Sequence, residues 1–164
     1  MRKWVFGTFL ISFLAKWPEP KSEASTGREF KIQTGVGLRV DLYSLEGAPK
    51  FQAPGQASRI ARILAQESGV AIGRAYYGKG MKAPYHSHVG VEYIHVLGGT
   101  GIFRTRSKEV VARAGQTLKF EAGEEHQLEN QLDEPLEFLF VYPHSKDIDI
   151  LYERWVRVQS MGKD

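Results

Sequence analysis

The sequence of 164 residues contains no cysteine, which excludes both disulfide bonds and thiolate metal sites. A tightly bound metal ion would therefore need ligands from histidine, aspartate or glutamate side chains. The absence does not decide the cellular compartment, because an exported protein can fold without disulfide bonds.

The chain also lacks a concentrated excess of positive charge. Its formal net charge is only +3, and the first 24 residues carry four basic residues against two acidic ones. In the remainder, acidic and basic residues are interspersed. Because a nucleic-acid-binding protein needs basic residues clustered on one face, nucleic acid is not an expected partner.

No apolar run is long enough for a membrane-spanning helix, which needs about 20 residues. Residues 4–15 form a shorter apolar run that follows Arg2 and Lys3 and precedes Lys16. This order is typical of a signal peptide, and residues 22–24 (SEA) offer a small-x-small cleavage site. The alternative is an added β-strand, because the run is rich in residues that favour strands.

These two interpretations set the expected domain organisation and location. Residues 1–29 are expected to hold the apolar segment, as a signal peptide or an added strand, and a linker rich in proline, serine and glutamate. Residues 30–164 are expected to form one domain, a size that can bury a proper core. The protein would be cytoplasmic, or exported to the periplasm if residues 1–24 are a signal peptide.

From residue 30 onward the sequence favours an all-β fold. Residues 30–45 alternate as N-terminal extension strands would, and residues 46–57 resemble a loop. Short runs of strand-forming residues then recur between glycine, proline, asparagine and aspartate, which is typical of a sandwich or barrel. The expected strands are residues 70–77, 92–97, 101–106, 110–112, 116–120, 127–130 and 136–142.

Three segments allow more specific predictions. Residues 136–142 are apolar at nearly every position, so both faces of that strand should be covered. Residues 58–66 fit either a short helix capped by Ser58 or a strand. Residues 147–158 carry apolar side chains at helical spacing, namely Ile148, Leu151, Tyr152 and Trp155. That spacing predicts a C-terminal amphipathic helix lying on the barrel or on a partner subunit.

Potential metal ligands gather just before and within the strand expected at 92–97. His86, His88 and Glu92 share the same parity, so their side chains can share one face of an extended chain. The two histidines would lie about 6.6 Å apart along a strand, which lets both imidazoles bind one ion. His126 could supply a fourth ligand from another strand. An isolated H-x-H is more often a structural or surface feature, but the added glutamate and histidine favour a metal site.

Residues 80–130 also carry a family resemblance in two spaced motifs. The first consists of Gly80, His86, His88, Glu92 and Gly99, and the second of Gly115, Gly123, His126 and Asn130. In these spacings they resemble the two motifs of the cupin superfamily. One position departs from the pattern, because Glu121 stands where the second motif has proline. The short connection of residues 100–114 resembles that of small single-domain cupins.

The resemblance implies a cupin jelly-roll β-barrel, also called a double-stranded β-helix, with a metal site in its mouth. In that family the histidines and glutamate of the first motif and the histidine of the second bind the ion. The resemblance therefore implies a ligand role for His86, His88, Glu92 and His126. Such nitrogen and oxygen donors suit one divalent transition metal ion, which could be iron, manganese, nickel, cobalt or zinc.

Two classes of function fit such a site. The resemblance allows a metal-dependent dioxygenase, isomerase or lyase that acts on a small oxygenated or anionic metabolite. The alternative is a non-catalytic cupin that binds or senses a sugar or an organic acid, because no clear catalytic acid or base is evident beyond the ligands. The resemblance also implies a homodimer, with Tyr93, Leu97 and the C-terminal helix as candidate contacts.

Several other residues near the ligands could contribute to a site, although packing or solvation is the simpler expectation for each. Those with a conceivable role toward a substrate are Tyr76, Tyr77, Tyr85, Arg74, Glu121, Glu124 and Glu125. Those expected to point into the barrel are Ile94, Val96, Leu118, Phe120 and Leu128. Phe138, Phe140 and Tyr142 are expected to form a core or dimer stripe. His95 and His144 are expected to lie away from the site.

Overall fold

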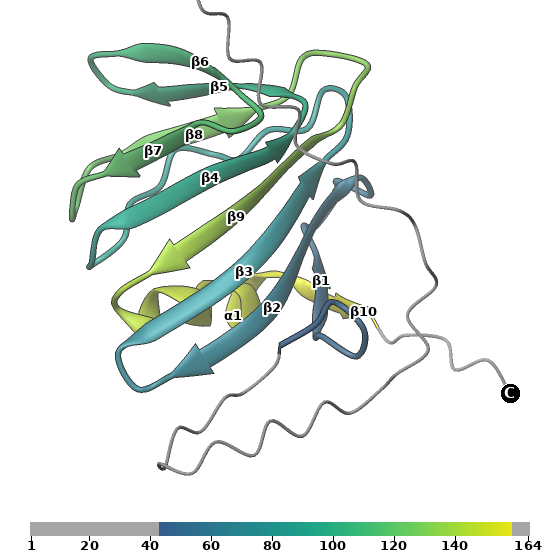
Figure 1. Ribbon diagram of the computed structural model, residues 1–164, viewed down its shortest axis with the longest axis vertical. Helices are drawn as coiled ribbons and strands as arrows, with labels where there is room; N and C mark the ends of the chain where they lie inside the picture. The colour runs from purple at the N-terminus through teal and green to yellow at the C-terminus, as the bar shows by residue number, and fades with distance from the viewer. Residues whose placement is uncertain (1–42, 159–164) are drawn as a thin grey trace, which may run out of the picture. The chain divides into compact units, whose positions relative to one another are not determined.

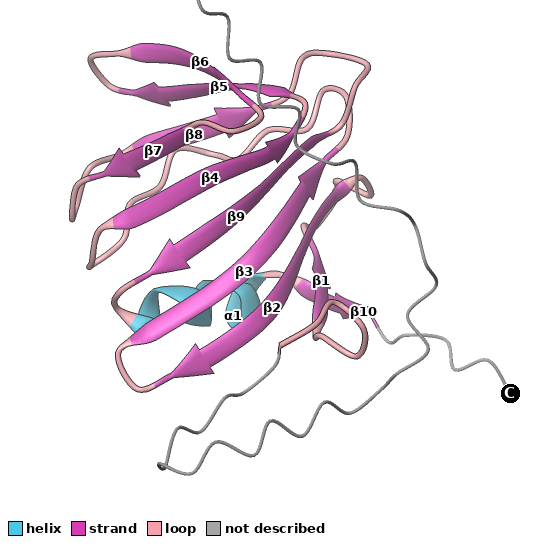
Figure 2. Ribbon diagram, viewed as in Figure 1, coloured by secondary structure: helices cyan, strands magenta, loops and turns pink. Residues whose placement is uncertain are grey.

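The computed structural model describes residues 43–158 (Figure 1). The predictions for the N-terminal apolar segment, the linker and residues 30–42 of the extension strands lie outside these residues. In the described part, ten strands, one 3-10 helix and one short α-helix follow one another along the chain. Figure 2 shows that strands dominate the fold, which confirms the all-β prediction.

The strands form two antiparallel sheets. The first five strands along the chain are β1 (Lys50–Gln52), β2 (Arg59–Glu67), β3 (Val70–Tyr77), β4 (Glu92–Gly98) and β5 (Thr100–Thr105). The next five are β6 (Glu109–Arg113), β7 (Thr117–Phe120), β8 (His126–Glu129), β9 (Leu136–Tyr142) and β10 (Val156–Val158). One sheet has the order β10-β1-β2-β3-β9-β4-β7, and the other has the order β6-β5-β8.

The alternation of buried and less buried side chains explains why these segments form strands. In β3 and β9 every second residue is buried and its neighbours are half-buried, as one-sided packing of a sheet requires. The core holds large side chains such as Phe51, Phe103, Ile94, Val96 and Leu136. Alternate residues of β9 are half-buried, so the face of this strand that points away from the core is partly covered in the described structure.

The sequence left residues 58–66 open between helix and strand, and the structure makes them part of strand β2. Arg59–Glu67 pairs with β3 from Arg59↔Tyr77 to Glu67↔Val70, with a bulge between Ile63 and Ala65. The local signal was ambiguous because apolar residues occur at both spacings, and the ladder with β3 decides between them. Strand β1 lies inside the segment 46–57 that was expected to be a loop.

The C-terminal segment is helical over a shorter range than predicted. A 3-10 helix, Ser145–Ile148, leads into α1, Asp149–Arg154, and no helix follows up to residue 158, where the described part of the chain ends. Residues Val156–Val158 instead form β10, which pairs with β1 along the edge of the larger sheet. Valines at positions 156 and 158 favour a strand where an unpaired edge is available, so the helix prediction was wrong for these residues. Within residues 43–158 no helix has the length and apolar character to cross a membrane.

Asn130 ties the end of β8 to neighbouring loops. Its side chain is fully buried and donates from Nδ2 to the carbonyl oxygens of Tyr77 and Glu134, each at 2.9 Å. Its Oδ1 accepts a hydrogen bond of 3.0 Å from the backbone N–H of Leu132. An amide supplies both donors and an acceptor at once, which no carboxylate or apolar side chain can do. This second-motif residue therefore holds the fold rather than the site.

Candidate metal centre and ligand pocket

The segment before β4 brings the first two histidines against β8. His86 and His126 exchange backbone hydrogen bonds, N–H to O, of 3.0 and 2.8 Å, and they form an isolated antiparallel bridge. The N–H of Ala83 also donates to the carbonyl of Leu128 at 2.8 Å. His86 and His88 therefore lie outside β4, whose first residue is Glu92. Pairing with β8 places His86, and the carbonyl oxygen of His88 accepts a hydrogen bond of 2.8 Å from the backbone N–H of Gly123.

The four predicted ligand residues converge in space. One candidate ligand atom from each of His86, His88, Glu92 and His126 lies within 4.8 Å of all the others. His88, Glu92 and His126 are buried, and His86 is half-buried. Glu92 Oε2 is 2.8 Å from His126 Nε2 and 3.5 Å from His88 Nε2. The group has the composition and spacing of a site that could hold one metal ion.

Backbone carbonyls orient two of the imidazoles. The Nδ1 atom of His86 lies 2.9 Å from the carbonyl oxygen of Pro84, and that of His126 lies 2.8 Å from the carbonyl of Glu124. A carbonyl oxygen can only accept, so Nδ1 carries the proton in each neutral ring and Nε2 presents a lone pair. This arrangement fixes the tautomer that binds a metal through Nε2.

Three buried atoms at the centre of this cluster have no hydrogen-bond partner among residues 43–158. They are Nε2 of His88, Oε2 of Glu92 and Nε2 of His126. Buried polar atoms are nearly always satisfied, so three unsatisfied atoms that point at each other indicate a missing shared partner. A divalent cation would satisfy all of them, and this donor set fits one.

Electrostatics favour the metal-binding protonation state at His86 and Glu92, whereas His126 holds a proton more readily than an ordinary histidine. Burial and the neighbouring His126 and His88 lower the pKa of His86 to about 4. Burial acts to raise the pKa of Glu92, but His126 and His88 outweigh it and lower that pKa to about 2. Burial likewise acts to lower the pKa of His126, and the adjacent Glu92 outweighs it, so that this pKa is raised. The group therefore contains a carboxylate that stays ionised and an imidazole that stays neutral.

Asp147 supports the loop between His88 and Glu92, and sequence reasoning did not identify it. Its buried carboxylate accepts hydrogen bonds of 2.9 Å from the backbone N–H groups of Val89 and Gly90. Asp147 lies far along the chain in the 3-10 helix, so no local pattern connects it with the ligands. The contact fixes the loop that spaces the second histidine from the glutamate.

Replacing Asp147 with alanine is expected to weaken metal binding about tenfold, because removing a group that orients metal ligands typically has that effect. It also removes the charged acceptor of two part-buried backbone N–H groups, which costs about 2 kcal/mol in the free energy of unfolding. Calorimetric titration with Mn²⁺ and urea denaturation measure the two effects. The matched control is Asp149→Ala, because Asp149 is exposed at the start of α1. Equal effects of both substitutions would contradict the assigned role.

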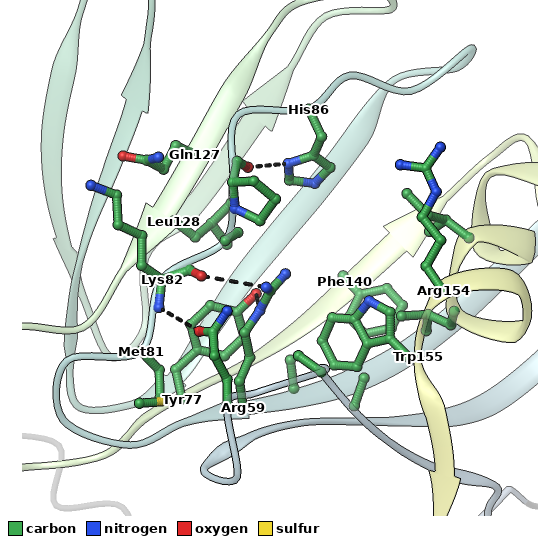
Figure 3. A pocket seen from close by; sticks show the side chains of 18 of the residues that line it. Arg59, Tyr77, Met81, Lys82, His86, Gln127, Leu128, Phe140, Arg154 and Trp155 are labelled. Carbon is green, nitrogen blue, oxygen red and sulfur yellow. Dashed lines mark hydrogen bonds between the residues drawn. The ribbon is translucent and has the colours of Figure 1, made fainter.

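A pocket of about 820 Å³ opens beside the cluster (Figure 3). His86, His88 and Glu92 contribute to its wall, and aromatic side chains from β3, β9 and the C-terminal segment line much of the rest. Apart from the cluster, the charged residues of the described chain that line the pocket are all basic, namely Arg59, Lys82 and Arg154. The size falls within the range of small-molecule sites, and the cationic lining favours an anion.

The predicted aromatic stripe on β9 contributes to this pocket. Phe138, Phe140 and Tyr142 are buried in the core, and all three also line the pocket. Burial, together with the nearby Glu92 carboxylate, raises the pKa of Tyr142 well above the usual range. Tyr77 is buried in the pocket wall, and burial raises its pKa although Arg59 opposes the shift.

The remaining candidate residues have other partners. Arg74 is ion-paired with Glu137 and, with Tyr76, lines a separate small cavity. The acidic loop is solvated: Glu121 pairs with Lys119 at 2.8 Å and Glu125 with Arg106 at 2.7 Å.

The last candidates divide between the outer surface and the core or pocket wall. His95 bonds Thr117 Oγ1 at 2.9 Å on the outer side of β4, and His144 is exposed, as expected. Tyr85 lines the pocket under the Arg106 guanidinium, and Phe120 stacks on the His126 ring at 4.2 Å. Leu128 lines the pocket, Leu118 packs against the core, and Ile94 and Val96 are buried in it.

Comparison with known proteins finds a matching family model and a related protein. A cupin domain model matches residues 73–142. An oxalate-binding protein from Thermotoga maritima is 36% identical over 116 residues, which cover 68% of this chain and 96% of that protein.

Solved structures show the same fold. An uncharacterized conserved protein with a double-stranded β-helix domain from Klebsiella pneumoniae matches with a TM-score of 0.56 at 14% identity, over 74% of this chain and 100% of that one. A predicted oxalate decarboxylase from Thermotoga maritima matches with a TM-score of 0.54 at 23% identity, over 62% of this chain and 96% of the other. The fold is thus the jelly-roll, or double-stranded β-helix, and the chain belongs to the cupin superfamily.

Proposed function

We propose that this protein is a metal-dependent cupin that binds a small organic acid, with His86, His88, Glu92 and His126 as the metal ligands. The convergence of four donor residues, three of whose buried atoms have no hydrogen-bond partner in the described part of the chain, carries the proposal. Three imidazoles and a carboxylate suit divalent iron, manganese, nickel, cobalt or zinc. When bound, such an ion supplies a Lewis acid for an oxygen-containing ligand.

The charge of the pocket supports an anion as the ligand. Arg59, Lys82 and Arg154 line it, whereas Glu92 is the one acidic side chain among the described lining residues. A metal ion would add further positive charge at Glu92. The relative at 36% identity is an oxalate-binding protein, so oxalate is the first ligand to test. A neutral sugar, which was the other ligand class considered, would make no use of these cations.

The same lining favours binding over turnover. A lyase that removes carbon dioxide from an organic acid must protonate the resulting carbanion, and a nearby acid usually supplies that proton. Glu92 is already assigned to the metal, and the raised pKa values of Tyr77 and Tyr142 make them weak proton donors. A dioxygenase, isomerase or lyase activity therefore stays a prediction from the sequence. The homodimer also stays a prediction.

Calorimetric titration of oxalate into protein loaded with Mn²⁺ tests the proposal. Saturable binding is expected with the loaded protein and none with protein stripped by a chelator and exchanged into fresh buffer. Glucose serves as the neutral comparison and should not bind. Incubation of the loaded protein with oxalate under air should release no formate. Oxalate binding of equal strength without metal, or none with metal, would refute the proposed function.

A further inference from the structure

Arg59, at the start of β2, places a guanidinium in the pocket wall away from the metal cluster. The residue is only 7% exposed. Its Nε donates to the Tyr77 hydroxyl at 3.0 Å, and Nη1 donates to the carbonyl oxygen of Lys82 at 3.3 Å. The ring centroids of Trp155 and Tyr77 are 4.7 and 5.3 Å from its Cζ atom. Figure 3 shows Arg59 beside Tyr77 and apart from His86.

This guanidinium has no carboxylate partner within residues 43–158. Arg74, Arg104 and Arg106, which are all more exposed, each form an ion pair with a glutamate. Arg59 uses two of its five N–H groups on neutral oxygens. Burying a charged group costs free energy unless the charge is paired. The Arg59 side chain lines the pocket, so a bound ligand can reach it. An anionic ligand would supply the missing partner.

We infer that Arg59 is a second anion subsite, so that the pocket takes an organic acid with two separated acidic ends. This inference rests on the proposed function: one end would lie at the metal cluster and the other at Arg59. Arg59 lies on β2 and Glu92 on β4 of the larger sheet, and strands β3 and β9 separate them, so the two subsites lie apart along the pocket wall. Oxalate alone cannot reach both, because its two carboxyl groups are bonded directly to each other.

The wall between the subsites suits the body of such a ligand. Leu128, Phe138 and Phe140 line it, and they offer apolar contacts but no hydrogen-bond partners for a polar linker. An arginine is better suited than a lysine to the far end, because its planar fork can bind a carboxylate through two parallel hydrogen bonds. The aromatic rings of Tyr77 and Trp155 hold that fork in place.

Matched pairs of ligands test the subsite. Protein loaded with Mn²⁺ is titrated with 2-oxoglutarate and 2-oxovalerate, and with 2-oxoadipate and 2-oxohexanoate. Within each pair the metal-binding end and the chain length are the same, and only the first member has a distal carboxylate. The diacid of at least one pair is expected to bind about tenfold or more tightly than its monoacid, as a charge-assisted hydrogen bond predicts.

The variant Arg59→Met should bring that ratio close to one, because the diacid should lose far more affinity than the monoacid. The control is Arg62→Met, which removes the same charge from β2, where Arg62 bonds the carbonyls of Leu45 and Ala48 outside this pocket. It should keep the wild-type ratio. If Arg59→Met does not fold, Arg59→Lys keeps the charge and should lower the ratio severalfold without affecting the monoacid.

The other possible results contradict either the Arg59 subsite alone or the proposed function as well. Oxalate binding combined with a ratio near one in the wild-type protein, for both pairs, would overturn the subsite and leave the proposed function standing. A high ratio that survives Arg59→Met, or an equal loss for diacid and monoacid, would assign Arg59 to structure alone. Failure of oxalate to bind the metal-loaded protein would overturn the proposed function and this inference with it.

Discussion

Replacing His126 with alanine is expected to abolish stoichiometric metal binding. The substitution removes one of four candidate donors and leaves the Glu92 carboxylate, 2.8 Å from the lost Nε2, without that neighbour in a buried site. A hydrogen bond to the Glu124 carbonyl already orients His126 for metal binding. Its loss should therefore weaken Mn²⁺ binding far more than the tenfold expected for Asp147→Ala, because Asp147 only supports the loop that carries other ligands. The stabilisation that the wild-type protein gains from metal should disappear with it.

Elemental analysis of the purified variant and thermal unfolding with and without Mn²⁺ measure these effects. At a free metal concentration about 100 times the dissociation constant, binding stabilises a protein by about 2.7 kcal/mol, so the wild-type melting temperature should rise clearly on loading. The control is His95→Ala, which removes an imidazole from the outer side of β4, where its partner is Thr117. Wild-type metal content in the His126 variant would contradict the assignment of this residue as a ligand.

The second large effect is expected from Gly99→Ala, which should lower the free energy of unfolding by about 3 kcal/mol or more. Gly99 has a φ of +71°, a conformation that strains any residue with a Cβ atom. A Cβ at this position would also lie 2.1 Å from the carbonyl oxygen of Pro135 and 3.2 Å from the Cα of Leu136. Both contacts are with backbone atoms, so no side-chain rotation can relieve them.

Urea denaturation of the metal-free protein measures the loss without a contribution from metal binding. Gly115→Ala is the matched control, because Gly115 has a φ of +85° but nothing within 4 Å of its added Cβ. The control isolates the cost of the backbone conformation, about 1 kcal/mol. Losses of the same size at both positions would show that the contact with residues 135 and 136 carries no cost.

Gly99 and Gly115 are required for different structural reasons. Both belong to the sequence motifs, and both have positive φ, but only Gly99 is pressed against a second segment of backbone. The sequence identifies both as positions that need glycine in the family pattern. The difference between them appears only when Pro135 is brought beside Gly99 by the fold.

Local alternation was sufficient to predict several strands with accuracy. The bounds of β3 and β9 agree with the predicted ones, because these central strands bury every second residue and end at turn-forming residues. Prediction was poorer at the sheet edge, where β1 and β10 are three residues each and show too little alternation to be recognised. Their pairing with each other and with β2 stabilises them, and that pairing joins distant parts of the chain.

The sequence by itself determined the all-β class and the four residues that converge in the candidate metal centre. The class follows from recurring short strand-forming segments, and the four residues follow from the fixed spacings of the two motifs that resemble those of cupins. Only the tertiary structure decided that His86 and His126 bridge through their backbones, that Asp147 holds the loop between the ligands, and that Arg59 faces the pocket unpaired. Those relations join residues that are far apart along the chain, and closure of the sheets around one core brings them together.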